Sequence, residues 1–251
     1  MLLKTGCGSF PVGRARYFAE LSAVEIGSTF HNLPQLSTAR SWREEAPKGF
    51  EFSLLAWQVI THTAASAGFA KTRLVDVPER RKAFYGHFRA SPEVLRAWES
   101  VKAVAEAMGA RFVVFDTPSS FYPDADHLRD MYKFFKGIDR GALKLVWHPR
   151  GAWTDLMADH ICRELGLLRA VDPLAGGAVK PRSGAARYFR VLGAGGGKPQ
   201  PGRGFDDRAL AGLLDVCAEK PSYVFFANRT AWQDARRLQE LSAGVRDLRR
   251  L

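Results

Sequence analysis

Eight short apolar runs separated by helix-like stretches constrain the fold of this chain more than any other feature. Each run is almost continuously apolar, as expected of strands in a parallel sheet whose two faces are both covered. Helical patterns lie between most of the runs, which is typical of repeated strand–helix units. The runs are Leu2–Cys7, Ala23–Ile26, Phe50–Leu55, Arg111–Phe115, Leu143–Trp147, Leu167–Val171, Ala186–Leu192 and Tyr223–Phe226.

Two of the predicted helices have well-marked ends. Ser91 and Pro92 supply an N-cap followed by proline at the first helical position, and Gly109 follows the last turn of the same apolar face. Asp124 opens a second helix, which Gly137 closes. These boundaries support helices between the fourth strand and its neighbours.

Eight strands alternating with helices predict one (β/α)8 barrel, a TIM-like fold, as a single domain over residues 1–251. The main alternative is an open doubly wound sheet. The G-x-G-x-x-G turn that would favour a dinucleotide-binding sheet is absent after the first strand, so no nucleotide cofactor is expected. The stretch GAGGGK at 193–198 comes late and does not open a clear helix.

Composition narrows the class of protein. The apolar content of 46% suffices for a globular core, and no apolar run approaches the roughly 18 residues of a membrane span. The N-terminal residues lack the pattern of a secretory signal, and Cys7, Cys162 and Cys217 are too scattered for a disulfide framework or zinc site. We therefore expect a cytoplasmic protein without membrane contacts, whose cysteines are buried and reduced.

The chain is strongly basic, with a net charge of +11 and a pI near 9.9. Such a charge favours anionic partners, either nucleic acid or an anionic small molecule such as a phosphorylated metabolite. Much of the excess is arginine on helix-like stretches, which equally suits the ion-pair networks of thermostable proteins. The sequence leaves these alternatives open, and it does not indicate an oligomeric state.

Three segments that follow predicted strands are longer than ordinary loops. Thr63–Ala90 follows the third strand, Leu174–Ala185 the sixth, and the glycine-rich Gly193–Gly204 the seventh. In a barrel, all three would rise above the C-terminal face, where substrates bind. Their basic residues include Lys71, Arg73, Arg80, Arg81, Lys82, Arg89, Lys198 and Arg203.

Polar side chains near the ends of the predicted strands are the candidates for chemistry. Glu25 lies in the apolar run Val24–Ile26, and it either acts as a general acid or base or forms a structural ion pair, for example with Arg190. His62, predicted to end the third strand after Thr61, could be a general base, a phosphate donor or a structural histidine.

Other candidates have stronger structural alternatives. Asp116 and Asp172 stand before proline-containing turns that aspartate often organises, and Asn228 is suited to cap a helix. Arg150 is suited to clamp an anion. The predicted catalytic residues are Glu25, His62 and Asp116, and the predicted substrate-binding residues are Gln58, Thr61, His148, Arg150, Arg190 and Asn228.

A divalent metal remains open, because barrel metal sites draw ligands from different strands and leave no local spacing. The six histidines show neither an H-x-H nor an H-E-x-x-H pattern. A phosphate site in the glycine-rich segment after the seventh strand is also open, against a plain surface loop. The conceivable metal ligands are Glu25, His62, Asp116, His148 and Asp172.

Taken in this order, several motifs resemble the YecE-like family, the domain of unknown function numbered seventy-two. They are VEIGSTFHNLP, WREEAP followed by FEFSLLAWQVITH, YGHF, VVFDTPSSF, PRGAW, VDP, YFRVLG and YVFFANRTAWQDA. The resemblance covers nearly the whole chain. It implies a TIM barrel and carries no settled activity.

The same resemblance implies departures at the strand ends. Leu55 stands where the family has lysine, Asp116 where it has glutamine, His148 where it has glutamate, Leu192 where it has histidine, and Ala227 where it has asparagine. The implication is either an enzyme with a different, anionic and phosphate-bearing substrate, or a diverged barrel that binds nucleic acid or a phosphorylated ligand without catalysis. The matching residues are Glu25, Thr29, Gln58, Thr61, His62, Arg150 and Arg190.

Overall fold

The eight strands follow one another around a closed barrel in sequence order, and the registered pairs are parallel. This arrangement confirms the predicted (β/α)8 fold over the open sheet. The computed structural model describes residues 2–72, 74, 78–175, 184–193 and 204–248. The strands are β1 Leu3–Cys7, β2 Ala23–Ile26, β3 Glu51–Leu55, β4 Ala110–Asp116, β5 Lys144–His148, β6 Leu168–Val171, β7 Arg187–Val191 and β8 Ser222–Phe226.

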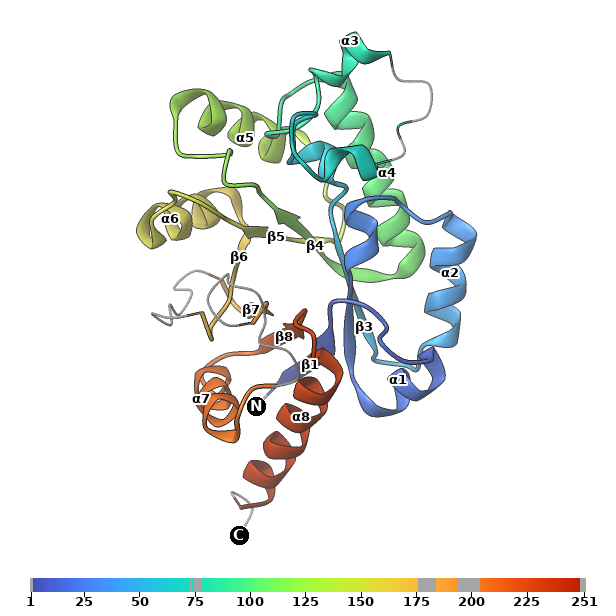
Figure 1. Cartoon of the computed structure of the whole chain (residues 1–251), viewed down its shortest axis with the longest axis vertical. Helices are drawn as coiled ribbons and strands as arrows, with labels where there is room; N and C mark the ends of the chain where they lie inside the picture. Colours follow the sequence, from blue (N-terminus) through green and yellow to red (C-terminus); the bar gives the residue numbers. More distant parts are fainter. Residues whose placement is uncertain (1, 73, 75–77, 176–183, 194–203, 249–251) are drawn as a thin grey trace. The chain divides into compact units, whose positions relative to one another are not determined.

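Helices alternate with these strands along the chain, as the colour gradient of Figure 1 shows. Each predicted strand boundary lies within about one residue of the observed one, because near-continuous apolar runs mark strands that are buried on both faces. The helices are α1 Arg14–Glu20, α2 Leu36–Glu45, α3 Glu79–Lys82, α4 Pro92–Met108, α5 Ala125–Gly137, α6 Asp155–Leu165, α7 Asp207–Cys217 and α8 Ala231–Leu248, with 3-10 helices η1 Gly27–Phe30, η2 Gln58–Ile60 and η3 Phe69–Lys71.

The hydrogen bonds and backbone angles at both ends of α4 confirm the predicted caps. Ser91 Oγ accepts a hydrogen bond from the backbone N–H of Val94 at 3.2 Å, and Pro92 occupies the first turn. Gly109 ends the helix with φ of +60°, a conformation that costs glycine little. Asp124 caps α5 in the same way, accepting from the N–H of His127 at 2.7 Å.

Contacts divide the chain into two compact units. Unit 1 comprises residues 1–25, 46–51 and 170–251, and unit 2 comprises residues 26–45 and 52–169. The core of unit 2 contains a cluster of aromatic rings that pack in tilted and edge-to-face arrangements, with centroids 5.0 to 6.3 Å apart, and such pairs contribute beyond plain area burial. Its members are Phe88, Trp98, Phe115, Phe134 and Phe135.

The long segment after β3 contains structure that the sequence did not predict. β3 ends at Leu55, the chain forms η2, and His62 follows that 3-10 helix, so the prediction that His62 ends the third strand is wrong. The apolar Val59 and Ile60 resemble a continuing strand in sequence, but both are fully buried in η2.

Most of the two other long segments lies outside the described residues, together with Lys198 and Arg203, and Arg73 does so as well. The predicted phosphate site in the glycine-rich segment therefore stays a prediction.

All three cysteines are buried and free, as predicted. Burial raises the pKa of Cys7, at the end of β1, to about 12, so its thiol is protonated at neutral pH. Across the described ranges, no helix combines the length and the hydropathy that crossing a membrane requires.

Candidate functional site

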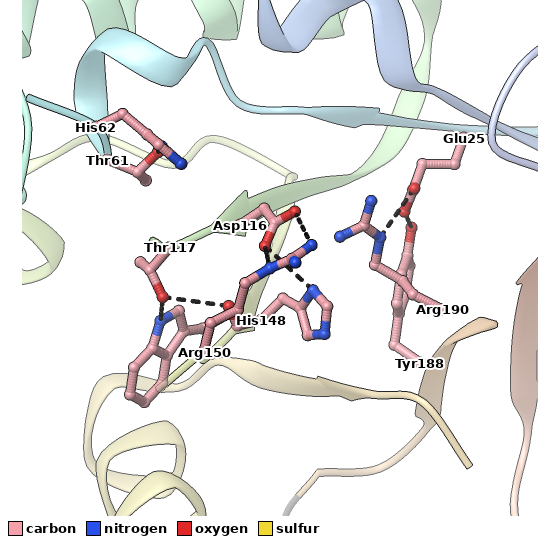
Figure 2. Close-up of polar contacts among 10 residues, drawn as sticks. Glu25, Thr61, His62, Asp116, Thr117, His148, Arg150, Tyr188 and Arg190 are labelled. Carbon is pink, nitrogen blue, oxygen red and sulfur yellow. Dashed lines mark hydrogen bonds and ion pairs between the residues drawn. The ribbon is translucent and has the colours of Figure 1, made fainter. Parts of the chain in front are cut away.

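The ends of β4 and β5 bring three predicted site residues of unit 2 together. Asp116 and His148 are register partners at the last residues of these strands. Arg150 donates from Nε to Asp116 Oδ1 at 2.7 Å and from Nη2 to Oδ2 at 2.8 Å, and His148 Nδ1 lies 3.3 Å from Oδ1 (Figure 2). Asp116 and His148 are buried, whereas the side chain of Arg150 is 46% exposed. The result is a bidentate ion pair with one face open to solvent.

A second set of hydrogen bonds fixes the backbone beneath this pair. Thr117 Oγ1 donates to the carbonyl oxygen of His148 and accepts from Trp147 Nε1, both at 3.2 Å (Figure 2). Trp153 Nε1 donates to the Phe121 carbonyl oxygen at 2.6 Å. These bonds tie the β4–α5 loop to the β5–α6 loop, so the carboxylate and guanidinium are held on rigid supports.

His62 belongs to the same unit and is influenced by the same charges. Its Nδ1 lies 2.9 Å from Thr61 Oγ1, which also donates to the Gln58 carbonyl oxygen at 3.4 Å. A hydrogen on Nδ1 would leave a lone pair on Nε2, for which the described residues provide no partner. Burial lowers the pKa of His62 to about 4, opposed by the charge of Asp116 and assisted by that of Arg150. The ring is therefore neutral at pH 7.

Gln58 anchors the segment that follows β3. It is fully buried, and its Nε2 donates to the Gly68 carbonyl oxygen at 3.0 Å and lies 2.9 Å from His31 Nδ1. It also contacts Thr72 Oγ1. The Gln58 amide nitrogen thus already has hydrogen-bond partners within the protein, and the role of Gln58 in substrate binding stays a prediction.

In unit 1, Glu25 forms the ion pair that the sequence left open. Arg190 Nε donates to Glu25 Oε1 at 2.9 Å, and Tyr188 Oη donates to Oε2 at 2.8 Å (Figure 2). The side chains of Glu25 and Arg190 are only 1% and 5% exposed. Both carboxylate oxygens have partners inside the protein, so the structural role is established, while a catalytic role stays a prediction.

Asn228 lies beside the start of α8 but does not cap it as expected from the sequence. Its Nδ2 donates to Asp234 Oδ2 at 2.6 Å and to Thr230 Oγ1 at 2.9 Å, whereas an N-cap side chain would accept from a backbone N–H. A cavity of about 510 Å³ adjoins it, and Arg229 and Trp232 are among the residues that line this cavity.

Asp172 has the turn-forming role that its position before proline predicted. It accepts from the backbone N–H groups of Leu174 and Leu192 at 3.0 and 2.9 Å. Nowhere in the described part of the chain do three His, Cys, Asp or Glu side chains form a group that could hold a metal ion. The metal ligands conceivable from the sequence therefore gain no support.

Sequence reasoning missed two partners that the structure reveals. Tyr188 stands two residues before Arg190, and alternation along a strand places such residues on one face, so this partner could have been found. His31 reaches Gln58 across 27 residues, and no local pattern indicates that contact.

The sequence matches the family model described as Protein of unknown function DUF72 over residues 13–248. A DUF72 protein from Enterococcus faecalis is similar in structure, with a TM-score of 0.69, 15% identity, and coverage of 96% of this chain and 98% of the other. A DUF72 protein from Thermotoga maritima is similar at a TM-score of 0.67 and 14% identity, with coverage of 97% of this chain and 100% of the other.

Endonuclease IV from Thermus thermophilus is similar at a TM-score of 0.54 and 12% identity, with 93% and 92% coverage, a likeness that shows the fold alone. No curated protein matches the sequence.

Proposed function

Since the chain belongs to the DUF72 family, whose description states no reaction, we propose a function from the geometry of unit 2. The protein is an enzyme that acts on an anionic, phosphate-bearing substrate. Arg150 binds the phosphate, His62 accepts a proton, and Asp116 with His148 orients the guanidinium. The observation that carries this proposal is a neutral histidine, with Nε2 lacking a partner among the described residues, in the field of a half-exposed arginine.

Arg150 has donors to spare for a ligand. A guanidinium has five N–H donors, and the two hydrogen bonds from Arg150 to Asp116 use Nε and one hydrogen of Nη2. The bidentate contact fixes the plane of the group, so little side-chain freedom would be lost when phosphate oxygens bind to its remaining edge. Asp116 therefore acts as a positioning residue, and Arg150 as the residue that contacts the substrate.

His62 becomes a better base when the substrate is bound. A neighbouring phosphate anion favours the protonated ring and raises the pKa of His62 from its low value in the free protein. Nε2 can then accept a proton from water or from a substrate hydroxyl, while Nδ1–H donates to Thr61 Oγ1.

The substrate class most worth testing first is a nucleic-acid phosphodiester. The name of the Thermus thermophilus neighbour, an endonuclease, suggests this class, and the +11 charge of the chain agrees with a polyanionic substrate. Nucleotides and sugar phosphates complete the panel, because Arg150 would recognise a phosphate group in any of them.

The test is an activity screen of phosphate esters with the wild type, His62→Gln and Arg150→Met. We expect each variant to lose about 100-fold or more in kcat/KM on the substrate found. Matched controls are His160→Gln and Arg129→Met, which change an exposed histidine and an exposed Arg–Asp pair on helices α6 and α5. Full activity in both His62→Gln and Arg150→Met would exclude the proposal.

A further inference from the structure

A chain of four polar side chains lies outside the site just described, on two loops and the first turn of α5. His87 Nε2 is 3.2 Å from Ser120 Oγ, and His87 Nδ1 is 3.0 Å from His127 Nε2. His127 Nδ1 is in turn 3.0 Å from Asp124 Oδ2 and 2.9 Å from the Tyr122 carbonyl oxygen. The order is therefore serine, histidine, histidine and carboxylate.

The partners at the far end fix the direction of every hydrogen bond when both rings are neutral. A carbonyl and a carboxylate only accept, so His127 must carry its hydrogen on Nδ1 and accept at Nε2. His87 must then donate from Nδ1, which leaves the lone pair of its Nε2 facing Ser120 Oγ. Burial lowers the pKa of His87 to about 4, which agrees with a neutral ring.

The backbone holds His87 in an unusual conformation. Its φ is +52°, which is uncommon outside glycine, and non-glycine strain of this kind persists only where the surroundings enforce it. The backbone N–H groups of Gly86 and His87 donate to Val59 and Thr61 at 2.8 and 3.1 Å. A Cβ on Gly86 would lie 2.5 Å from the His62 backbone, so this close backbone contact leaves no room for a side chain.

Ser120 is placed on an equally constrained loop while remaining exposed. The N–H of Phe121 donates to the Pro118 carbonyl oxygen at 3.0 Å, and the ring of Phe121 is fully buried. Gly151 approaches so closely that a Cβ there would meet the Ser119 backbone at 3.1 Å. Two residues after the serine, Tyr122 is 51% exposed and offers an apolar surface.

We propose that Ser120 is the nucleophile of a second active centre that hydrolyses small carboxylic esters, with His87 as its base and His127 and Asp124 as positioning residues. A nucleophile bonded to a base, with the base oriented by a third group, is the arrangement that such chemistry requires. Nothing in this centre uses the Arg150–Asp116 pair, so the two proposals stand independently.

The reaction proceeds in two balanced halves. Ser120 Oγ attacks the ester carbonyl carbon as its proton passes to His87 Nε2, and the C–O bond to the alcohol then breaks as His87 returns that proton to the alcohol oxygen. Water repeats the sequence on the acyl-serine and releases the carboxylic acid and the free serine. His127 stabilises the transient charge on His87 by accepting from its Nδ1–H.

The test uses a fluorophosphonate probe and p-nitrophenyl acetate on the full chain. We expect the probe to modify Ser120, as located by peptide mass, and both probe labelling and ester hydrolysis to fall about 100-fold in Ser120→Ala and His87→Asn. Asparagine is chosen because it tolerates positive φ at position 87. Ser119→Ala, which alters the neighbouring exposed serine, is the matched control and should retain labelling.

A further variant separates loss of chemistry from loss of folding. Asp124→Asn preserves an N-cap for α5 but removes the charge that orients His127, so we expect labelling to slow about tenfold while thermal unfolding is unchanged. Absence of labelling in the native wild type, or equal labelling of Ser120 in wild type and His87→Asn, would overturn the proposal.

Discussion

Two arginine–carboxylate pairs in this molecule share their chemistry and differ in their access to water. Glu25 and Arg190 of unit 1 form a pair whose side chains are 1% and 5% exposed, with Tyr188 as a further donor. Asp116 and Arg150 of unit 2 also form a short pair, but the arginine is 46% exposed. A buried pair is costly to break and closed to ligands, whereas a pair with an open guanidinium edge can serve a ligand.

Breaking the closed pair should have the largest effect on folding. Glu25→Gln removes the carboxylate charge that the buried Arg190 guanidinium pairs with, and we expect the free energy of unfolding to fall by about 3 to 5 kcal/mol in urea titrations. The double variant Glu25→Leu with Arg190→Met should recover most of this loss, because it removes both charges of the Glu25–Arg190 pair together. If Glu25→Gln kept full stability but lost activity on a substrate found by screening, Glu25 would be catalytic instead.

The next effect comes from the buried histidine near the open pair. The pKa of His62 is lowered in the folded protein, so the unfolded chain binds more protons between about pH 6.5 and pH 4. Stability should therefore decrease as pH falls through that window. The change in the pKa of His62 from 6.5 to about 4 corresponds to roughly 3 kcal/mol. We expect a loss in unfolding free energy of about 2 kcal/mol, because the ring is partly solvated and solvent screens its charge.

Urea titrations at pH 7, 6, 5 and 4 measure this loss, and His62→Gln should flatten the pH dependence by about that amount. The matched control is His160→Gln, since His160 is exposed on α6. A wild-type slope that His62→Gln leaves unchanged would assign the pH dependence to other groups, such as His87.

Opening the exposed pair should cost less. Arg150→Met removes a half-exposed partner while His148 remains 3.3 Å from Asp116, so we expect a loss of about 1 kcal/mol in unfolding free energy. Arg129→Met, at a fully superficial Arg–Asp pair, should change stability by less than about 0.5 kcal/mol. A loss as large as that of Glu25→Gln would show that the two pairs do not differ in kind.

The sequence predicted the strands closely and the polar contacts only in part, and the reason is the range over which each is determined. Strand boundaries depend on local apolar runs. Asp116 and His148 could be placed together because both end neighbouring strands. The bond from Tyr188 to Glu25 spans 163 residues, so only the closed barrel brings its atoms together.

His62 and Asn228 show two other limits of pattern reading. The apolar residues of η2 resemble a continuing strand in sequence, so the sequence predicts a strand end at His62, whereas His62 follows a 3-10 helix. Asn228 is a residue type that often caps helices, but its side-chain amide donates to Asp234 instead. In both cases tertiary contacts decided between conformations that the local residues allow equally.

The smallest predicted effect concerns the source of the +11 charge, and it compares arginines on α8 with those on α3. On α8, Arg236 pairs with Glu20 at 2.5 Å and Arg237 pairs bidentately with Asp207. These contacts agree with the alternative that the excess arginine forms ion pairs within the protein. On α3, Arg80 is exposed and has no acidic partner among the residues that the structure describes.

If unit 2 binds nucleic acid, Arg80→Ala should weaken binding to non-specific duplex DNA and reduce the slope of log K against log salt by about 1. Arg236→Ala should leave that slope unchanged, because its charge is already neutralised by a carboxylate. Fluorescence anisotropy at salt concentrations from about 50 to about 200 mM measures both the affinity and its salt slope, because affinity for DNA changes strongly over this range. Equal slopes in wild type and Arg80→Ala would show that α3 does not contact the DNA. Salt-insensitive binding would show that the basic charge serves ion pairs on the surface and not DNA binding.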